Sequence, residues 1–287
     1  MKSLFKSDLA KQEIFSLYDQ KLAELNIEFE YLKVPTSYGH TNIIVTGNLA
    51  NPPILVIHGS NGCAPIALET YPNLSTQFRV YAIDVLAQPN KSAETRLSMK
   101  DDSYGKWINE IIDYLKLENV TMVGFSFGGL VILKTLEFDQ SKVKEVFLAS
   151  PAYLVNGNPF KAMFKIFIPM KRFISTQKPR FVEQFLMEVF SDRDEFAVKF
   201  LSQVFLNFDM DFASVPVIDK EKANSITTPI TLYAAENDIL FPGKKMIERA
   251  SEIFPSLIKS KLFESGKHVQ SRAQNTLIEN AIIQSIA

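Results

Sequence analysis

Hydrophobic residues are arranged along this chain in two patterns that follow one another repeatedly. Short, continuous apolar runs are typical of strands buried on both faces of a parallel sheet, and longer runs with an apolar residue every three or four positions are typical of amphipathic helices. After a hairpin over 27–34 and 41–46, the short runs predict strands at 54–57, 78–83, 120–123, 143–149, 230–234 and 257–263. The periodic runs predict helices at 8–24, 65–77, 103–116, 243–253 and 269–285.

The alternation of strand and helix stops in one region, residues 152–225. This region contains Phe-rich helical patterns broken by prolines and no strand candidate. Alternation that is interrupted in this way predicts an α/β protein with a mostly parallel central sheet, helices on both faces and an inserted helical cap. We expect a core domain made of residues 1–151 and 226–287, with residues 152–225 as the cap.

Composition narrows the class of protein. The chain has 287 residues, of which 46% are hydrophobic, so it can bury a large core. Its formal net charge of −1 argues against a nucleic-acid-binding protein, which would carry a basic face. The single cysteine, Cys63, cannot form an internal disulfide and fits a reducing compartment. With no pattern typical of a signal peptide or of a membrane-spanning helix, we expect a soluble, cytoplasmic protein.

The main chemical motif is Gly124-Phe125-Ser126-Phe127-Gly128, which stands between an apolar β-branched run and a helix-forming run. A strand, a tight turn and a helix around Gly-x-Ser-x-Gly are typical of a nucleophile elbow. A serine on such a turn needs neighbours without a Cβ atom, and the two glycines meet that need. The sequence therefore predicts Ser126 as a nucleophile.

A serine hydroxyl needs a base, and the base needs an acid that orients it. His268 follows the last predicted strand and Asp238 follows the strand before it, so both should reach the carboxyl edge of the sheet, where catalytic groups gather. The chain order Ser126, Asp238, His268 is that of a hydrolase triad. Glu236 is a rival acid, and we prefer Asp238 because the longer side chain nearer the strand can face a neighbouring loop.

Two backbone N–H groups should stabilise the oxyanion, those of Phe127 at the helix start and Ser60 in the loop after the strand at 54–57. His58 precedes that loop, and we expect it to bond neighbouring loops rather than to act in catalysis. Asp84 ends a strand but precedes the nucleophile in the chain, so we expect it to tether a loop.

These motifs together resemble the α/β-hydrolase-fold serine hydrolases, in the capped subgroup of carboxylesterases and related lipolytic or C–C-bond hydrolases. The resemblance runs over nearly the full length and is carried by His58-Gly59-Ser60, Gly124–Gly129, Asp238 and His268. It implies a hydrolase fold and a triad but does not indicate the substrate. Ser126 disfavours the haloalkane dehalogenase and epoxide hydrolase branches, which use aspartate at this position.

The first part of the predicted cap carries apolar residues at helical spacing among basic ones, namely Phe160, Met163, Phe164 and Phe167. No acidic residue occurs between 159 and 182. The pattern fits a lid helix over an acyl pocket, an ordinary packed cap helix with solvated lysines, or a basic amphipathic segment in peripheral contact with anionic lipid. A second cap helix is expected within 192–208.

We therefore expect a cofactor-free, metal-free esterase whose partner is a small-molecule ester with an apolar part. C–C hydrolysis or perhydrolysis on the same triad is the alternative enzyme hypothesis. A hydrolase-fold receptor that binds its ligand for signalling is the alternative from another class, and the sequence does not separate these.

Overall fold

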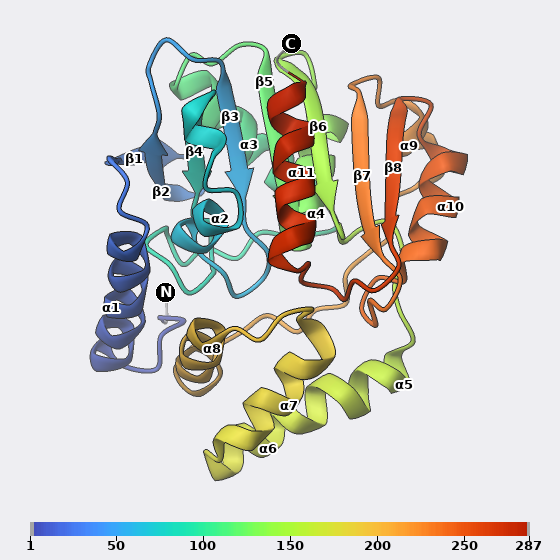
Figure 1. Ribbon diagram of the computed structural model, residues 1–287. Coiled ribbons are helices and arrows are strands. Elements are labelled where there is room, and N and C mark those ends of the chain that lie inside the picture. The colour runs from blue at the N-terminus through green and yellow to red at the C-terminus, as the bar shows by residue number, and fades with distance from the viewer. Residues whose placement is uncertain (1–2, 286–287) are drawn as a thin grey trace.

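An eight-stranded sheet forms the centre of the protein (Figure 1), as seen in a computed structural model that describes residues 3–285. The strand order is β1-β2-β4-β3-β5-β6-β7-β8. A hairpin of β1 (Glu30–Thr36) and β2 (Gly39–Thr46) joins the sheet through an antiparallel pairing of β2 with β4. The other neighbouring strands pair in parallel, and they are β3 (Pro53–Ile57), β4 (Arg79–Ile83), β5 (Val120–Phe125), β6 (Val143–Ala149), β7 (Ile230–Ala235) and β8 (Leu257–Phe263).

Helices cover both faces of the sheet, which confirms the predicted fold class. One face is covered by α2 (Ala64–Thr70) and α11 (Arg272–Gln284), and the other by α3 (Ser103–Tyr114), α4 (Phe127–Phe138) and α10 (Gly243–Ile253). The first helix, α1 (Asp8–Glu24), lies beside the α2 face. Central strands are buried on both sides. Successive residues of a strand point to opposite faces of the sheet, and on β5, Met122 belongs to one apolar cluster and Val123 to the other.

Two predicted helix boundaries differ from the structure for local reasons. The helix expected over 65–77 ends at Thr70 and is followed by a short 3-10 helix, Leu74–Thr76. Pro72 disfavours helical backbone at the residue before it and so ends α2. The last helix begins at Arg272 because Ser271 forms a capping box with Gln274, in which each side chain bonds the other residue's backbone N–H.

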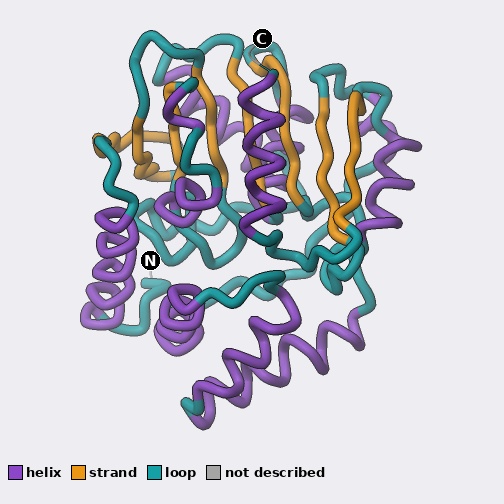
Figure 2. The backbone as a smooth tube through the Cα atoms, in the orientation of Figure 1, coloured by secondary structure: helices purple, strands orange, loops and turns teal. Residues whose placement is uncertain are grey.

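A helical insertion separates β6 from β7 and contains no strand over residues 159–207, as Figure 2 shows. It lies beyond the carboxyl ends of the parallel strands. Its elements are α5 (Pro159–Ala162), a π-helical turn (Met163–Phe167), α6 (Ile168–Thr176), α7 (Pro179–Val189) and α8 (Glu195–Asn207), with α9 (Lys220–Asn224) leading back to the sheet. No helix within residues 3–285 is both long enough and apolar enough to cross a membrane.

The π-helical turn changes the apolar stripe that the sequence predicts for the first cap helix. It lies directly before α6, where Pro169 has no N–H to donate to the carbonyl of Lys165. The wider turn separates the expected stripe into two parts. Phe160 and Phe164 are exposed, whereas Phe167 is half-buried with its ring 6.0 Å from that of Phe212.

Candidate active site

Ser126 occupies a strained turn between β5 and α4. Its backbone has φ 52° and ψ −114°, in a region that non-glycine residues rarely adopt. The turn is closed by close backbone approach, since a Cβ atom on Gly128 would lie 2.2 Å from the carbonyl oxygen of Ile57. A Cβ atom on Gly124 would lie 2.7 Å from the Gly128 carbonyl group. The two glycines thus make room for the turn that directs Ser126 out of the sheet.

The structure brings the three predicted triad side chains into one hydrogen-bonded chain. The Nε2 atom of His268 lies 2.9 Å from Ser126 Oγ, and its Nδ1 atom lies 2.8 Å from Asp238 Oδ2. A carboxylate can only accept, so Nδ1 carries the proton and Nε2 is free to accept from the serine hydroxyl. Both distances fall within the range needed for proton transfer. All three residues are buried, with exposed fractions of 7% or less.

Asp238, rather than Glu236, meets His268. The second carboxylate oxygen of Asp238, Oδ1, accepts hydrogen bonds from the backbone N–H groups of Leu240 (2.8 Å) and Phe241 (2.9 Å). These two donors fix the orientation of the carboxylate. Glu236 instead forms an ion pair with Lys244 at the surface. The preference for Asp238 at this position is therefore consistent with the geometry.

Two aromatic rings enclose the imidazole of His268. The ring of Phe125 lies 5.1 Å from it and that of Phe241 lies 5.4 Å from it, measured between centroids. Phe125 in turn fits against Gly59, where a Cβ atom would lie 2.8 Å from the phenyl ring. With the rings packed around the imidazole, His268 is only 5% exposed, and burial strengthens its hydrogen bonds to Ser126 and Asp238.

The two N–H groups expected to bind the oxyanion have no partner among the described residues. Phe127 is the first residue of α4, where helical N–H groups lack an intrahelical acceptor. Ser60 lies in the loop after β3, and its neighbour Asn61 has φ 58° and donates its N–H to Gln88 Oε1 at 2.7 Å. Both groups are therefore available to an acceptor outside the chain.

His58 bonds neighbouring loops, as the sequence predicts. Its Nδ1–H donates to the carbonyl of Gly59 (2.7 Å), and its Nε2 accepts from the N–H of Val85 (3.0 Å). Burial lowers the pKa of His58 to about 4, so the ring is neutral at pH 7. Asp84 also tethers loops, accepting from the N–H of Ala64 and from the Asn42 amide, both at 2.8 Å. Burial raises the pKa of Asp84 to about 6.

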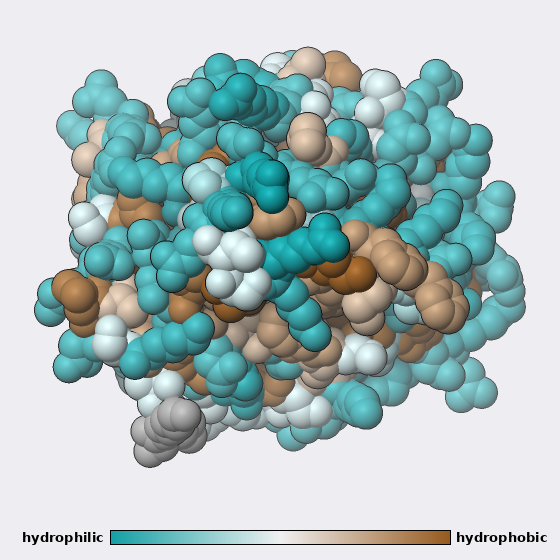
Figure 3. Space-filling view, turned by 90° about the horizontal axis from the view of Figure 1, so that it is seen from below, coloured by the Kyte–Doolittle hydropathy of each residue, from teal (hydrophilic) through white to brown (hydrophobic). Residues whose placement is uncertain are grey.

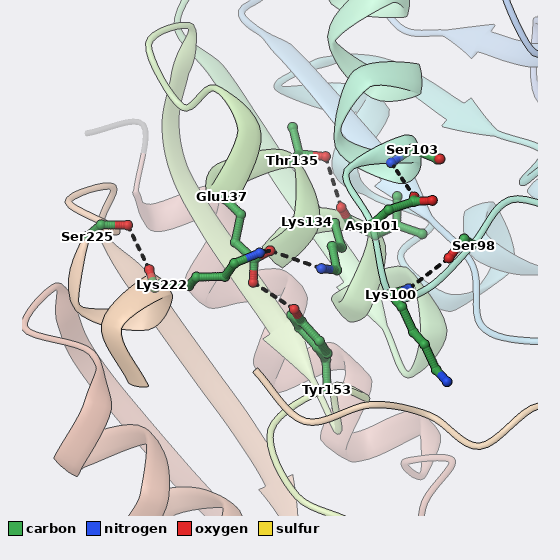
Figure 4. Close-up of polar contacts among 11 residues, drawn as sticks. Ser98, Lys100, Asp101, Ser103, Lys134, Thr135, Glu137, Tyr153, Lys222 and Ser225 are labelled. Atoms are coloured by element: carbon green, nitrogen blue, oxygen red, sulfur yellow. Dashed lines mark hydrogen bonds and ion pairs between the residues drawn. The ribbon is translucent and has the colours of Figure 1, made fainter. Parts of the chain in front are cut away.

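A polar cluster near the end of α4 contacts both ends of the insertion (Figure 4). Lys134 and Glu137, on α4, form an ion pair at 3.0 Å and are almost fully buried. The hydroxyl of Tyr153, where the insertion begins, donates to Glu137 at 2.8 Å. Lys222, where the insertion returns, lies 3.5 Å from the same carboxylate. The helix that follows Ser126 is thereby in contact with both ends of the insertion.

Some large apolar side chains of the insertion are exposed to solvent. Figure 3, which views the protein from below relative to Figure 1, shows an apolar patch bordered by hydrophilic side chains. The exposed large apolar residues of the insertion are Phe160, Met163, Phe164, Met187, Phe212 and Val217. The predicted lid face is therefore accessible to solvent over much of its area.

Two parts of the chain that shape the site are not indicated by the hydrophobic pattern of the sequence. Phe241 encloses His268, and the segment around Ser191 bonds the loop that carries His268. Both lie between periodic elements, where the hydrophobic pattern gives no information about long-range contacts. The proximity of Leu240 and Phe241 to Asp238 in the chain is the one available indication, because an aspartate often accepts from N–H groups two or three residues further on.

Comparison with known proteins agrees with this geometry. Residues 52–214 match the alpha/beta hydrolase fold family. Two Bacillus subtilis (strain 168) proteins are similar over most of their length: an uncharacterized carboxylesterase, nap, is 24% identical over 280 residues, and the carboxylesterase YbfK is 25% identical over 284 residues. These alignments cover 94% of this chain and 91% and 92% of the two relatives.

Solved structures show the same fold. The naproxen esterase (carboxylesterase NP) from Bacillus subtilis superposes with a TM-score of 0.84 at 21% identity, covering 98% of this chain and 99% of that one. Carboxylesterase CesB (YbfK) from the same organism gives a TM-score of 0.80 at 21% identity, covering 96% and 97%. With more than half of its residues matched by the family pattern, this chain belongs to the alpha/beta hydrolase fold family.

Proposed function

We propose that the protein is a carboxylesterase that cleaves small-to-medium carboxylic esters through an acyl-enzyme on Ser126. The observation that carries this proposal is the hydrogen-bonded chain from Ser126 Oγ through His268 to Asp238. The two Bacillus carboxylesterases, similar over nearly the whole chain, support the same class of substrate. The cap, residues 152–225, contributes the walls that contact the remainder of the ester.

The reaction then proceeds in two halves. Ser126 Oγ attacks the ester carbonyl carbon while His268 Nε2 takes the hydroxyl proton, and the carbonyl electron pair moves to oxygen. The N–H groups of Phe127 and Ser60 stabilise that oxyanion, each contributing about 10²–10³ in rate. The tetrahedral intermediate collapses, the alcohol leaves with the proton from His268, and the acyl group remains on Ser126. Water, deprotonated by His268, attacks the acyl-enzyme and releases the acid.

Asp238 keeps the imidazole of His268 in the tautomer that these reaction steps require. It accepts the Nδ1–H bond throughout and stabilises the imidazolium formed in each half-reaction. Because His268 and Asp238 are buried, with exposed fractions of 5% and 3%, the interaction between them is stronger than it would be at the surface.

The test is turnover of a series of p-nitrophenyl esters from acetate to octanoate. Wild type should hydrolyse several members, and Ser126→Ala and His268→Ala should each nearly abolish turnover. The double variant should be little worse than either single variant, because triad members act as a unit. Ser202→Ala is a matched control, since the Ser202 hydroxyl bonds the Val198 carbonyl within α8. It should retain wild-type rates.

A covalent probe separates the enzyme from a receptor with the same fold. A p-nitrophenyl alkylphosphonate should form a bond from phosphorus to Ser126 Oγ and release p-nitrophenol, which gives a mass increase in wild type that is missing in Ser126→Ala. Absence of turnover and of the adduct, with saturable ester binding retained in Ser126→Ala, would replace the esterase proposal with the receptor hypothesis.

A further inference from the structure

The end of α7 runs directly along the loop that carries His268. The N–H of Val269 donates to the carbonyl of Val189 at 2.9 Å, and the N–H of Ser191 donates to the carbonyl of Val269 at 2.9 Å. The two segments form an isolated parallel bridge between Phe190 and Val269. The residue that follows His268 is thus bonded to the insertion through both of its backbone polar groups.

The residue that precedes His268 is bonded to the same segment. The N–H of Lys267 donates to Ser191 Oγ at 2.9 Å, and the Lys267 ammonium group bonds the carbonyl of Met187 near the end of α7. A further contact follows the loop, where the N–H of Arg272 donates to Asp192 Oδ2 at 2.8 Å. His268 therefore lies in a loop that the insertion holds on both sides.

We infer that residues 187–192 of the insertion position His268, with Ser191 as the positioning residue; the inference rests on the proposed esterase function. Ser191 is the one residue of this segment that bonds both chain neighbours of His268, through its hydroxyl and through its N–H. Its hydroxyl is the sole acceptor for the Lys267 N–H among the described residues.

Small displacements of the base matter because the site has two hydrogen bonds to satisfy at once. His268 meets Ser126 at 2.9 Å and Asp238 at 2.8 Å, from opposite sides of one ring. Catalytic groups must be held within about 0.5 Å of the productive geometry. A displacement of about 1 Å can cost about 10²-fold in rate. Loss of the Ser191 hydroxyl would free one side of the loop while leaving the triad side chains intact.

This arrangement gives the insertion a role besides covering the site. The carboxyl end of α7 cannot lift away from the sheet without breaking its bonds to Lys267 and Val269. The outer helix, α5 to α6, has no such bond to the His268 loop among residues 3–285. The inner edge of the insertion is thus part of the machinery that orients the base.

The experiment compares Ser191→Ala with Ser191→Thr, which keeps a hydroxyl at the same atom. On p-nitrophenyl butyrate, Ser191→Ala should lower kcat by about 10–100-fold while KM changes by less than about 2-fold, and Ser191→Thr should recover most of the loss. Ser175→Ala is the matched control in the insertion, because its hydroxyl bonds only the Arg172 carbonyl among the described residues. It should behave as wild type.

A spectroscopic measurement tests the same inference without turnover. The His268 Nδ1–H, hydrogen-bonded to a buried carboxylate, should give a low-field proton resonance that Asp238→Ala removes. In Ser191→Ala this resonance should broaden or move upfield, and in Ser191→Thr it should return. Lys267→Met, which removes the bond to the Met187 carbonyl, should act in the same direction and serves if Ser191→Ala does not fold.

The outcomes separate this inference from the proposed function. Wild-type kcat and an unchanged resonance in Ser191→Ala, with a lowered unfolding temperature, would show that Ser191 merely holds the insertion down and would overturn the inference. Failure of wild type to hydrolyse any ester would overturn the esterase proposal, and the resonance would still decide whether Ser191 positions His268.

Discussion

Replacing Asp238 with asparagine should disable the base while leaving the fold almost unchanged. Oδ1 of Asp238 accepts from two backbone N–H groups, and Oδ2 accepts from His268 Nδ1–H. An asparagine has one acceptor oxygen and one NH₂ group. The position of Oδ1 faces two backbone N–H donors, whereas the position of Oδ2 faces only His268 among the described residues. The amide oxygen of the asparagine will therefore face Leu240 and Phe241, and its NH₂ group will face His268.

That orientation forces the wrong tautomer on His268. A donor facing Nδ1 requires Nδ1 to accept, so the proton moves to Nε2 and the imidazole can no longer accept the proton of Ser126. The expected loss in kcat is about 10⁴-fold, or about 5 kcal/mol of transition-state stabilisation. The two backbone hydrogen bonds survive, so the unfolding free energy should change by no more than about 1 kcal/mol.

The assay is kcat and KM on p-nitrophenyl butyrate, with urea unfolding as the measure of stability. Glu236→Gln is the matched control. Glu236 is two residues before Asp238, and its substitution removes an equivalent charge from a surface ion pair with Lys244. Exposed ion pairs contribute at most about 1 kcal/mol to stability, so this variant should stay folded. Because the Glu236 carboxylate pairs with Lys244 rather than with His268, the variant should also retain nearly full activity. Greater damage from Glu236→Gln than from Asp238→Asn would refute the assignment of the acid.

Three further predictions follow from local geometry. Gly128→Ala should abolish activity and lower stability by several kcal/mol, because its Cβ would lie 2.2 Å from the Ile57 carbonyl oxygen; a folded, active variant would contradict this. Burial lowers the pKa of His58 to about 4 from 6.5, so the folded state binds fewer protons than the unfolded state between those values. The stability that comes from keeping this imidazole neutral is fully present above pH 6.5 and is lost as pH falls towards 4. The unfolding free energy of wild type, measured with urea, should therefore fall by about 3 kcal/mol more than that of His58→Gln between pH 6.5 and pH 4. A difference between the two proteins that does not change with pH would count against this prediction. Phe164→Ala, at an exposed position of the cap, should leave the unfolding temperature unchanged and alter the ranking of p-nitrophenyl esters by acyl chain length. Phe167→Ala, which loses its contact with Phe212, should lower the unfolding temperature. Equal effects of the two substitutions on the unfolding temperature would contradict this prediction.

The sequence predicts the core of this protein well because the residues of each strand indicate by themselves that the strand is buried. A run such as Ile54 to Ile57 is apolar throughout because both faces are buried, and that holds whichever strands lie beside it. Ser126, Asp238 and His268 each follow such a strand, so topology alone brings them to one edge of the sheet. The predicted proximity of these three side chains therefore needs no knowledge of the cap.

The insertion is less predictable because its structure depends on contacts distant in the chain. The apolar spacing at Phe160 and Phe164 predicts a helix, but the π-helical turn before Pro169 decides which side chains are buried. The bond from Lys267 to Ser191 joins residues 76 positions apart and leaves no periodic pattern. Such contacts become visible only when the fold is known.

Two of the places where the insertion is bonded to the rest of the protein are Glu137 of α4 and the loop that carries His268. Glu137 contacts the beginning of the insertion through Tyr153 and its end through Lys222, and so joins both to the helix that follows Ser126. Ser191 holds the middle of the insertion against the loop of the base. Both members of the proton-transferring pair are therefore connected to one inserted segment, the first through α4 and the second through its own loop. For the proposed esterase, we expect changes in the outer helix to alter which esters fit, and the loss of the Ser191 hydroxyl to alter the distance between His268 and Ser126.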